Sequence, residues 1–169
     1  QAGNARAHAV TGTPHLVRSL VQMDEPDHMK YRTLTQAWFM PQSIRKREEE
    51  IRALAKDAVA QFVKLPGACD FVKDVALHYP LRVVMNILGV PEQDFPRMLR
   101  LTQELFGASD PDTQRFRDSL NDEQFSQILL AVIQDFTDYF GAISAERRAH
   151  PRDGLATLIA KAGIDGRPI

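Results

Sequence analysis

Between residues 122 and 149, apolar side chains recur every three or four positions, and this spacing constrains the fold more than any other feature of the chain. The stripe consists of Phe125, Leu129, Val132, Ile133, Phe136 and Phe140. This spacing lines up apolar groups along one face of a helix, whereas a half-buried strand needs strict alternation. No convincing alternating pattern occurs anywhere in the chain. The sequence therefore predicts a mainly α fold, an irregular array of packed helices rather than a symmetric bundle.

Turn and break signals divide the chain into successive segments. The expected order is a loop over 1–22, helices over 24–40, 43–64, 70–90 and 92–106, a connection over 107–121, and helices over 122–149 and 153–162. Asp24 and Ser43 are the expected caps of the first two helices, and Pro80 is expected to kink or restart the third. Segment 70–90 is apolar on more than one face, which predicts a well-buried helix. Segment 43–64 is expected to bury a stripe made of Ile44, Ile51, Ala55, Ala58 and Phe62.

Charge and cysteine content exclude several classes of function. Twenty-one basic residues against 22 acidic ones give a net charge of -1, so no strong field attracts nucleic acid or an anionic membrane. The single cysteine, Cys69, excludes an internal disulfide and a multi-cysteine metal site, and it favours a reducing, cytoplasmic setting. No uninterrupted apolar run approaches the roughly 18 residues that span a bilayer. The first residue is not methionine and the last are "GIDGRPI", so both ends are interpreted as cut.

The stretch "MDEPDHMKYR", residues 23–32, places His28 and Arg32 four residues apart on one face of the first predicted helix. One interpretation is a solvated pair on a polar helix face. The other is anion recognition, because an arginine fork with a second donor one turn away can orient a carboxylate or phosphate. No second ligand at metal spacing accompanies the other histidines, which are His8, His15, His78 and His150. Taken alone, the residues leave both interpretations of the pair open.

The order of these segments resembles the N-terminal and middle part of a bacterial cytochrome P450. The family pattern Met-Asp-Pro-Pro-x-His-x-x-x-Arg, followed by Phe-x-Pro, is matched from Met23 to Arg32 and from Phe39 to Pro41. Glu25 stands where the family usually has its first proline, and "LGVP" at 88–91 is a second recurrent element. "YPLRVVMNILGVPE" and "RLTQELFG" look closest to the soluble type that hydroxylates α-terpineol. The resemblance implies that the predicted helices are the family's helices C to H, without helices I to L and most of the β structure.

The resemblance also implies roles for individual residues. His28 and Arg32 are expected to donate to the propionates of haem b. Cys69 is not the expected haem ligand, because the family's Phe-x-x-Gly-x-x-x-Cys-x-Gly motif fails: Leu65 and Phe71 occupy the two glycine positions. Cys69 is expected instead to be partly buried between two helices. "AGIDG" at 162–166 imitates the family's oxygen-activating motif, but its final glycine replaces a threonine, so a turn is expected there.

By the same resemblance, the whole protein is a monooxygenase that uses dioxygen to hydroxylate a small hydrophobic substrate, in particular a monoterpenoid alcohol. Its expected electron source is a ferredoxin with an NAD(P)H-dependent reductase, and Lys30 either contributes to ferredoxin docking or is simply solvated. This chain alone contains no catalytic residue or metal ligand of the family and is expected to be inactive. Segments 9–21 and 102–120 are expected to line or cover the substrate pocket, although their apolar residues can equally be ordinary core. The residues concerned are Leu16, Leu20, Val21, Leu105 and Phe106.

Two alternatives do not involve catalysis. The first is an all-α sensor module whose aromatic helices enclose a hydrophobic effector, but no DNA-reading helix-turn-helix is visible in the sequence. The second is a helical interaction protein without a small-molecule site. That alternative leaves the ordered match across five helices unexplained.

Overall fold

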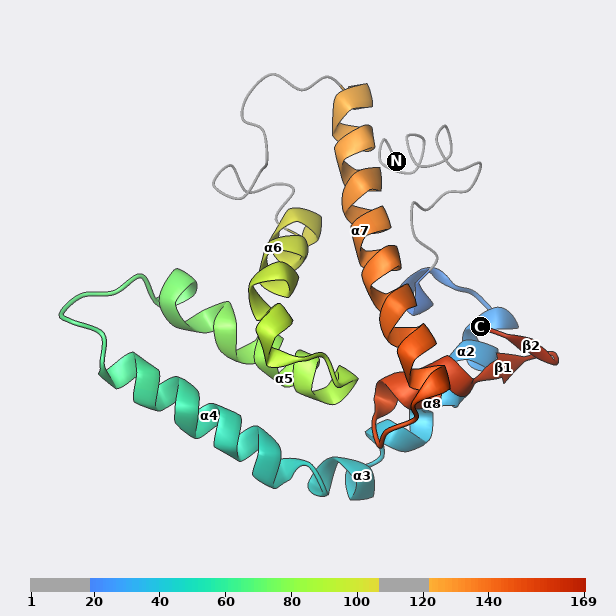
Figure 1. Cartoon of the computed structure of the whole chain (residues 1–169), viewed down its shortest axis with the longest axis horizontal. Helices are drawn as coiled ribbons and strands as arrows, with labels where there is room; N and C mark the ends of the chain where they lie inside the picture. Colours follow the sequence, from blue (N-terminus) through green and yellow to red (C-terminus); the bar gives the residue numbers. More distant parts are fainter. Residues whose placement is uncertain (1–18, 107–121) are drawn as a thin grey trace. The chain divides into compact units, whose positions relative to one another are not determined.

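The computed structural model describes residues 19–106 and 122–169, except the side chains of residues 122, 123, 125 and 126. Helices dominate these residues, which confirms the mainly α prediction (Figure 1). Besides α-helices there are short 3-10 turns and one π-helical turn, η3. In chain order the elements are η1 (Leu20–Gln22), α2 (Asp27–Gln36), η2 (Ala37–Phe39), α3 (Pro41–Arg45), α4 (Glu48–Val63), η3 (Val72–Ala76), α5 (His78–Leu88), η4 (Glu92–Asp94), α6 (Phe95–Phe106), α7 (Asp122–Ala149), α8 (Leu155–Lys161), β1 (Gly163–Ile164) and β2 (Arg167–Pro168).

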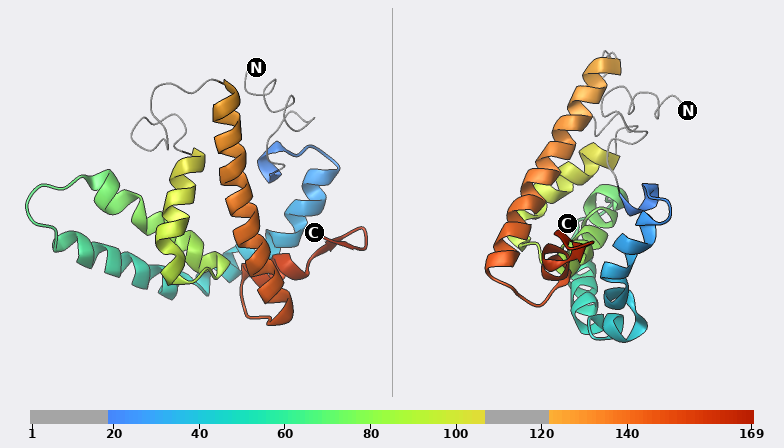
Figure 2. Two further views of the ribbon diagram at one scale, coloured as in Figure 1. Left: turned by 45° about the horizontal axis from the view of Figure 1, so that its top comes forward. Right: turned by 90° about the vertical axis from the view of Figure 1, so that its right-hand side faces the viewer.

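The chain divides into two compact units, and the first comprises residues 1–32 and 100–142. Within this unit the end of α6 and the first part of α7 lie side by side (Figures 1 and 2). Leu101 of α6 and Val132 of α7 are the largest fully buried side chains of the described residues. Phe136 and Phe140 stack in parallel with their ring centroids 6.2 Å apart. Val132 is thus a buried position of the stripe predicted on α7. The side chain of Phe125, another member of that stripe, lies outside the described residues.

The second unit comprises residues 33–99 and 143–169, and its core is small. Its buried apolar residues are Met85, Val90, Phe95, Met98, Leu155 and Ala160. Helices α4 and α5 contact each other, and Arg82 of α5 lies 3.4 Å from Asp57 of α4. The predicted deep burial of segment 70–90 is wrong for Phe71 and Val72, which are exposed, and α4 has no buried residue. The described residues of this unit provide no element that covers those faces.

The segment predicted as one helix over 43–64 is two helices. Pro41 occupies the first turn of α3, where it has no useful amide hydrogen to lose, so the helix begins before the predicted cap. Ser43 lies inside α3, and its hydroxyl donates to the Ala37 carbonyl at 2.9 Å instead of capping. Lys46 and Arg47 form a turn that separates α3 from α4. Because the two helices are closely spaced and share one apolar pattern, periodicity alone predicted a single helix.

The expected restart near Pro80 is present. The π-helical turn η3 ends at Ala76 and α5 begins at His78, so Pro80 lies in the first turn of the new helix. The first amides of a helix have no intrahelical acceptor, and a proline is tolerated there. At the other end of α5, Gly89 has a φ of 68°, and Val90 donates back to the Met85 carbonyl at 2.9 Å.

Two neighbouring arginines at the end of α7 bind the backbone of other elements in the second unit. Arg147 donates to the Gly89 carbonyl at 2.9 Å, and Arg148 donates to the Ala160 carbonyl at 2.7 Å. The Gly89 carbonyl directly follows α5, and the Ala160 carbonyl lies in the last turn of α8. The last carbonyls of a helix have no intrahelical hydrogen-bond donor, so they are available to the arginines. The two arginines thereby join the ends of three helices.

The chain ends in a short hairpin that the sequence analysis missed. Gly163 pairs with Pro168 and Ile164 with Arg167 in an antiparallel arrangement. Asp165 and Gly166 have φ values of 51° and 76°, as a two-residue hairpin turn requires. The expected turn at "AGIDG" is thus confirmed, but strands of two residues are too short to produce an alternating pattern.

One helix in the described part of the chain, over residues 127–149 of α7, is long and apolar enough to cross a membrane, with a mean hydropathy of 1.3. Gln134, Asp135 and Asp138 interrupt this segment, and the apolar run before them covers only residues 128–133. Core helices of soluble proteins meet the same criterion, and this helix alone is weak evidence for a membrane span.

Candidate functional site

His28 and Arg32 lie one turn apart on α2, as the sequence predicted. The helix starts with Asp27, whose negative charge complements the helix dipole, and the His28 amide donates to the Asp24 carbonyl at 3.0 Å. The His28 side chain is 29% exposed, and its Nδ1 lies 3.6 Å from Glu25 Oε1, an ion pair when the imidazole is protonated. Arg32 is exposed. Lys30, between them in sequence, has its Nζ 4.0 Å from Asp27 Oδ1.

This donor set fits the carboxylates of a haem. Arg32 offers a planar fork of N–H donors and His28 adds a ring donor, and both can make charge-assisted hydrogen bonds with a carboxylate. No residue of α2 is buried, so the helix carries these donors on an accessible surface. The assignment of His28 and Arg32 to haem propionates therefore stays a prediction, and the chemistry of both side chains fits it.

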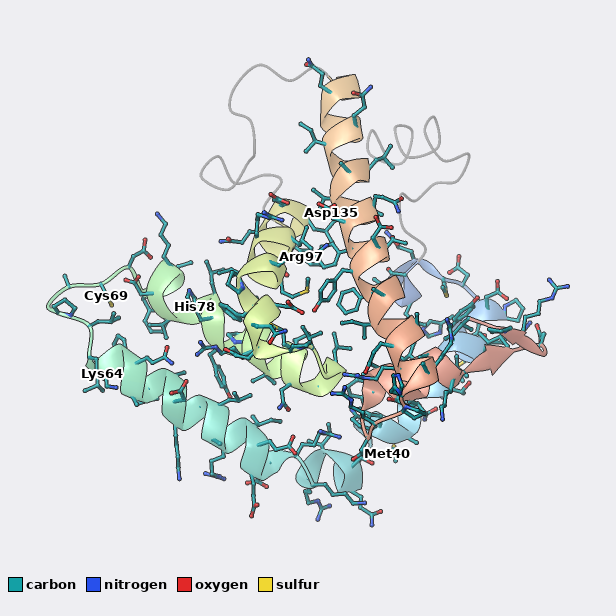
Figure 3. All side chains as sticks on the ribbon, in the orientation of Figure 1. Met40, Lys64, Cys69, His78, Arg97 and Asp135 are labelled. Atoms are coloured by element: carbon teal, nitrogen blue, oxygen red, sulfur yellow. The ribbon has the colours of Figure 1, made fainter. Side chains whose placement is uncertain are left out.

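Cys69, the single cysteine of the chain, lies outside the helices. Cys69 is exposed in the connection between α4 and η3, whose other end is at Lys64 (Figure 3). The expectation that Cys69 would be partly buried between two helices is therefore wrong, because the chain leaves α4 before it and re-enters a helix only at Phe71. Among the described residues there is also no group of three His, Cys, Asp or Glu side chains that could hold a metal ion.

The residues expected to line a substrate pocket are not gathered in a described cavity. Leu16 lies outside the described residues. Val21 is almost fully exposed, Phe106 and Leu20 are exposed, and Leu105 is half-buried. Their role in substrate binding stays a prediction.

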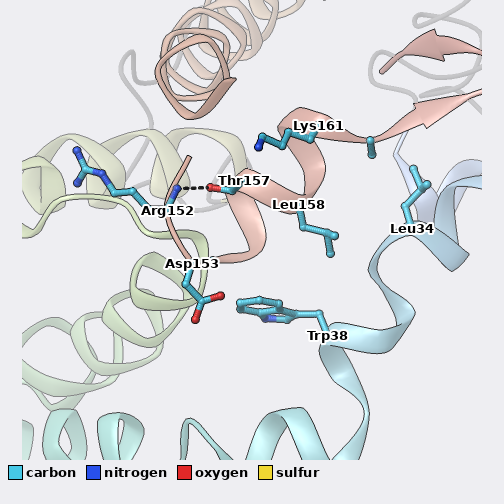
Figure 4. Close-up of a pocket in the computed structure, with 9 residues that line it drawn as sticks. Leu34, Trp38, Arg152, Asp153, Thr157, Leu158 and Lys161 are labelled. Atoms are coloured by element: carbon cyan, nitrogen blue, oxygen red, sulfur yellow. Dashed lines mark hydrogen bonds between the residues drawn. The ribbon is translucent and has the colours of Figure 1, made fainter. Parts of the chain in front are cut away.

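The second unit contains a cavity of about 490 Å³ that the sequence analysis did not anticipate (Figure 4). Its lining residues are Leu34, Trp38, Arg152, Asp153, Gly154, Thr157, Leu158, Lys161 and Ala162. Trp38 forms one wall, and its indole lies beside Asp153. The Trp38 Nε1 is buried and has no hydrogen-bond partner among the described residues. Trp38 is the only tryptophan of the chain, but its sequence context gives no signal of a site.

The Trp38 ring is covered by the cation of Arg47, the residue that precedes α4. The guanidinium carbon of Arg47 lies 4.3 Å from the ring centroid. Arg47 also forms an ion pair with Glu50 at 3.2 Å, and its Nη2 lies 3.9 Å from Asp153 Oδ2. Arg47 lies in the charged run "RKREEE" of residues 45–50, yet its side chain is only 18% exposed.

Comparisons with known proteins identify the family. No protein-family model matches the chain. A curated relative, cytochrome P450-terp of a Pseudomonas species, is 45% identical over 161 residues, which are 94% of this chain and 37% of the relative. The chain belongs to the cytochrome P450 family. The steroid C26-monooxygenase of Mycobacterium tuberculosis strain H37Rv is 31% identical over 147 residues, 87% of this chain and 35% of that protein.

Solved cytochrome P450 structures share the fold. The crystal structure of CYP108D1 from Novosphingobium aromaticivorans matches with a TM-score of 0.82 and 45% identity, over 100% of this chain and 38% of that one. Mycobacterium marinum CYP268A2, solved in complex with pseudoionone, gives a TM-score of 0.78 and 30% identity over 90% of this chain and 35% of that one. The chain thus spans less than two fifths of the length of these cytochromes P450.

Proposed function

We propose that the whole protein is a haem-thiolate monooxygenase that hydroxylates a small hydrophobic substrate, specifically a monoterpenoid alcohol. The observation that carries this proposal is the 45% identity to cytochrome P450-terp over 94% of the chain. In the proposed reaction, one atom of dioxygen enters a substrate C–H bond, and two electrons and two protons reduce the other atom to water. The electrons come from a ferredoxin and its NAD(P)H-dependent reductase, and the protein is soluble and cytoplasmic.

The contribution of this chain to the reaction is to hold haem b by its carboxylates. Haem, when bound with a cysteine thiolate, supplies the activation of dioxygen. His28 and Arg32 donate hydrogen bonds to the propionates. These bonds offset the unfavourable free energy of removing the carboxylates from water. The thiolate comes from a cysteine other than Cys69, which is exposed in a connection and lacks the surrounding glycines.

The substrate is proposed to lie against apolar side chains of the first unit. The apolar surface proposed for this contact belongs to Leu20, Val21, Leu105 and Phe106. The described residues leave Val21 and Phe106 exposed. Together with Leu16, these side chains suit a small terpenoid because an apolar pocket holds such a substrate by surface burial. The chain alone binds neither iron nor dioxygen in this proposal and is inactive.

The experiment is to sequence the coding region downstream of Ile169, express the whole protein and supply it with a monoterpenoid alcohol, a ferredoxin system and isotopically labelled dioxygen. We expect a downstream Phe-x-x-Gly-x-x-x-Cys-x-Gly motif, a thiolate-ligated haem spectrum and one labelled oxygen atom in the product. A stop codon directly after Ile169, or a DNA-binding unit downstream, would contradict the proposal and favour the sensor module. A haem enzyme that ignores terpenoids and oxidises another class of substrate would contradict the substrate alone.

A further inference from the structure

Arg47 connects three parts of the second unit. Its guanidinium stacks over Trp38 in η2, pairs with Glu50 in the first turn of α4, and lies 3.9 Å from Asp153 in the loop before α8. Tryptophan is the most favourable aromatic ring for a cation–π contact, and the contact gains strength when it is shielded from water. At 18% exposure the Arg47 side chain is largely shielded. These contacts fix the corner between the end of α2 and the start of α4.

The position of Arg47 is not explained by the stability of its own helix. Arg47 is the N-cap residue of α4 and makes no side-chain capping bond. A cation at a helix N-terminus is opposed by the helix dipole, which favours the acidic residues that follow, Glu48, Glu49 and Glu50. The contacts of Arg47 with Trp38 and Asp153 reach away from α4 and therefore act on the elements around it.

The corner determines where α2 points. The helix runs without a break from Asp27 to Gln36 and continues directly into η2, which contains Trp38. The Ser43 hydroxyl also binds the Ala37 carbonyl at 2.9 Å, so the end of this segment is held from two sides. At 1.5 Å per residue, His28 lies roughly 15 Å along the helix axis from Trp38. A tilt of about 5° at the corner therefore moves His28 by roughly 1 Å, more than the about 0.5 Å that a preorganised binding site tolerates.

We propose that Arg47 is a positioning residue for haem. By stacking on Trp38 and pairing with Glu50 and Asp153, it sets the direction of α2 and thereby the placement of His28 and Arg32 against the haem propionates. This inference rests on the proposed function. It gives the half-buried guanidinium of Arg47 a role in haem retention, although Arg47 lies 19 positions after His28 in the sequence.

The test uses the whole haem protein and measures the rate at which haem transfers to an excess of apomyoglobin. Arg47→Ala is expected to raise this rate about 3- to 10-fold, the range of one shielded cation–π contact. Arg47→Lys keeps the charge but loses the planar stacking surface, so its rate is expected to lie between those of the unaltered protein and Arg47→Ala. The matched control is Arg52→Ala, which removes an exposed arginine of α4 with its own ion pair to Glu48 at 2.7 Å. This control is expected to leave the rate within about twofold.

A double-mutant cycle distinguishes positioning from general stabilisation. In a His28→Ala/Arg32→Ala background, Arg47→Ala is expected to add less than about twofold, because the groups that it positions are gone. An equal effect of Arg47→Ala in both backgrounds would overturn the positioning role while leaving the propionate role intact. A normal haem-loss rate in the His28→Ala/Arg32→Ala protein would overturn the propionate role, and the positioning role with it. If Arg47→Ala fails to fold, the cycle is run with Arg47→Lys, for which the same outcomes decide.

Discussion

Helix α4 and the segment from Met85 to Met98 belong to the same unit but differ in what they bury. Met85 and Met98 are each 3% exposed, and Val90 and Phe95 are buried with them. On α4, by contrast, Val59 and Val63 are 60% and 75% exposed, and no residue is buried. Both segments are rich in apolar residues at helical spacing, so periodicity does not distinguish them. The difference shows which apolar face the described residues cover and which one they leave exposed.

The largest expected effect separates the isolated 169 residues from the whole protein. With apolar faces such as that of α4 uncovered, the isolated chain is expected to aggregate or to unfold without a cooperative transition. The measurement is thermal unfolding followed by near-UV and far-UV circular dichroism, with the whole protein as the control. A single sharp transition at both wavelengths for the isolated chain would contradict the view that α4 lacks its covering surface.

Within the whole protein, Met98→Ala is expected to lower the free energy of unfolding by about 2–5 kcal/mol. The substitution removes a buried side chain and leaves a cavity in the small core. Met40→Ala is the matched control, because Met40 is 51% exposed at the start of α3. Chemical denaturation measures both. An equal decrease in the free energy of unfolding for the two variants would contradict the placement of Met98 in the core.

Gly89→Ala is expected to cost about 1–2 kcal/mol at the end of α5. The residue has a φ of 68°, a conformation that a Cβ strains, and the added carbon would lie 3.5 Å from Arg147 Nη2. The control is Gly141→Ala in α7, where a Cβ meets nothing within 4 Å and φ is helical. That substitution is expected to stabilise by up to about 1 kcal/mol. The same denaturation experiment compares the signs, and a stabilising Gly89→Ala would exclude strain at this turn.

Val63→Ala tests the α4 face with the smallest effect and the clearest sign. If further protein covers Val63 in the whole molecule, losing two carbons is expected to cost about 1 kcal/mol after the gain in helix propensity. If Val63 stays in water, the same substitution is expected to stabilise α4 by a few tenths of a kcal/mol. The free energy of unfolding of the whole protein decides between the two signs.

The sequence predicted the helical class and most helix positions because apolar spacing and breaker residues are local signals. It failed where the outcome depends on neighbours. Pro41 starts α3 ahead of Ser43, the hairpin at Gly163–Ile164 is too short for a pattern, and Phe71 is exposed although its segment is apolar. Burial depends on which elements meet, and spacing within one segment cannot reveal that.

The candidate site divides in the same way. The four-residue spacing of His28 and Arg32 was visible in the sequence, and α2 places them one turn apart on the same face. The corner formed by Trp38, Arg47 and Asp153 was not visible, because its members are separated by up to 115 positions and meet only through folding. A charged run such as "RKREEE" has the same letters whether it is solvated or stacked on an indole.

The most direct test of the account is haem retention in the whole protein after His28→Ala/Arg32→Ala. We predict that haem is lost at least about 10-fold faster than from the unaltered protein, because two charge-assisted hydrogen bonds to the propionates are removed. Lys30→Ala is the control, since it removes a cation from the same helix without removing either donor. Unchanged haem content and an unchanged rate of haem transfer in the double variant would contradict the assignment of His28 and Arg32 to the propionates.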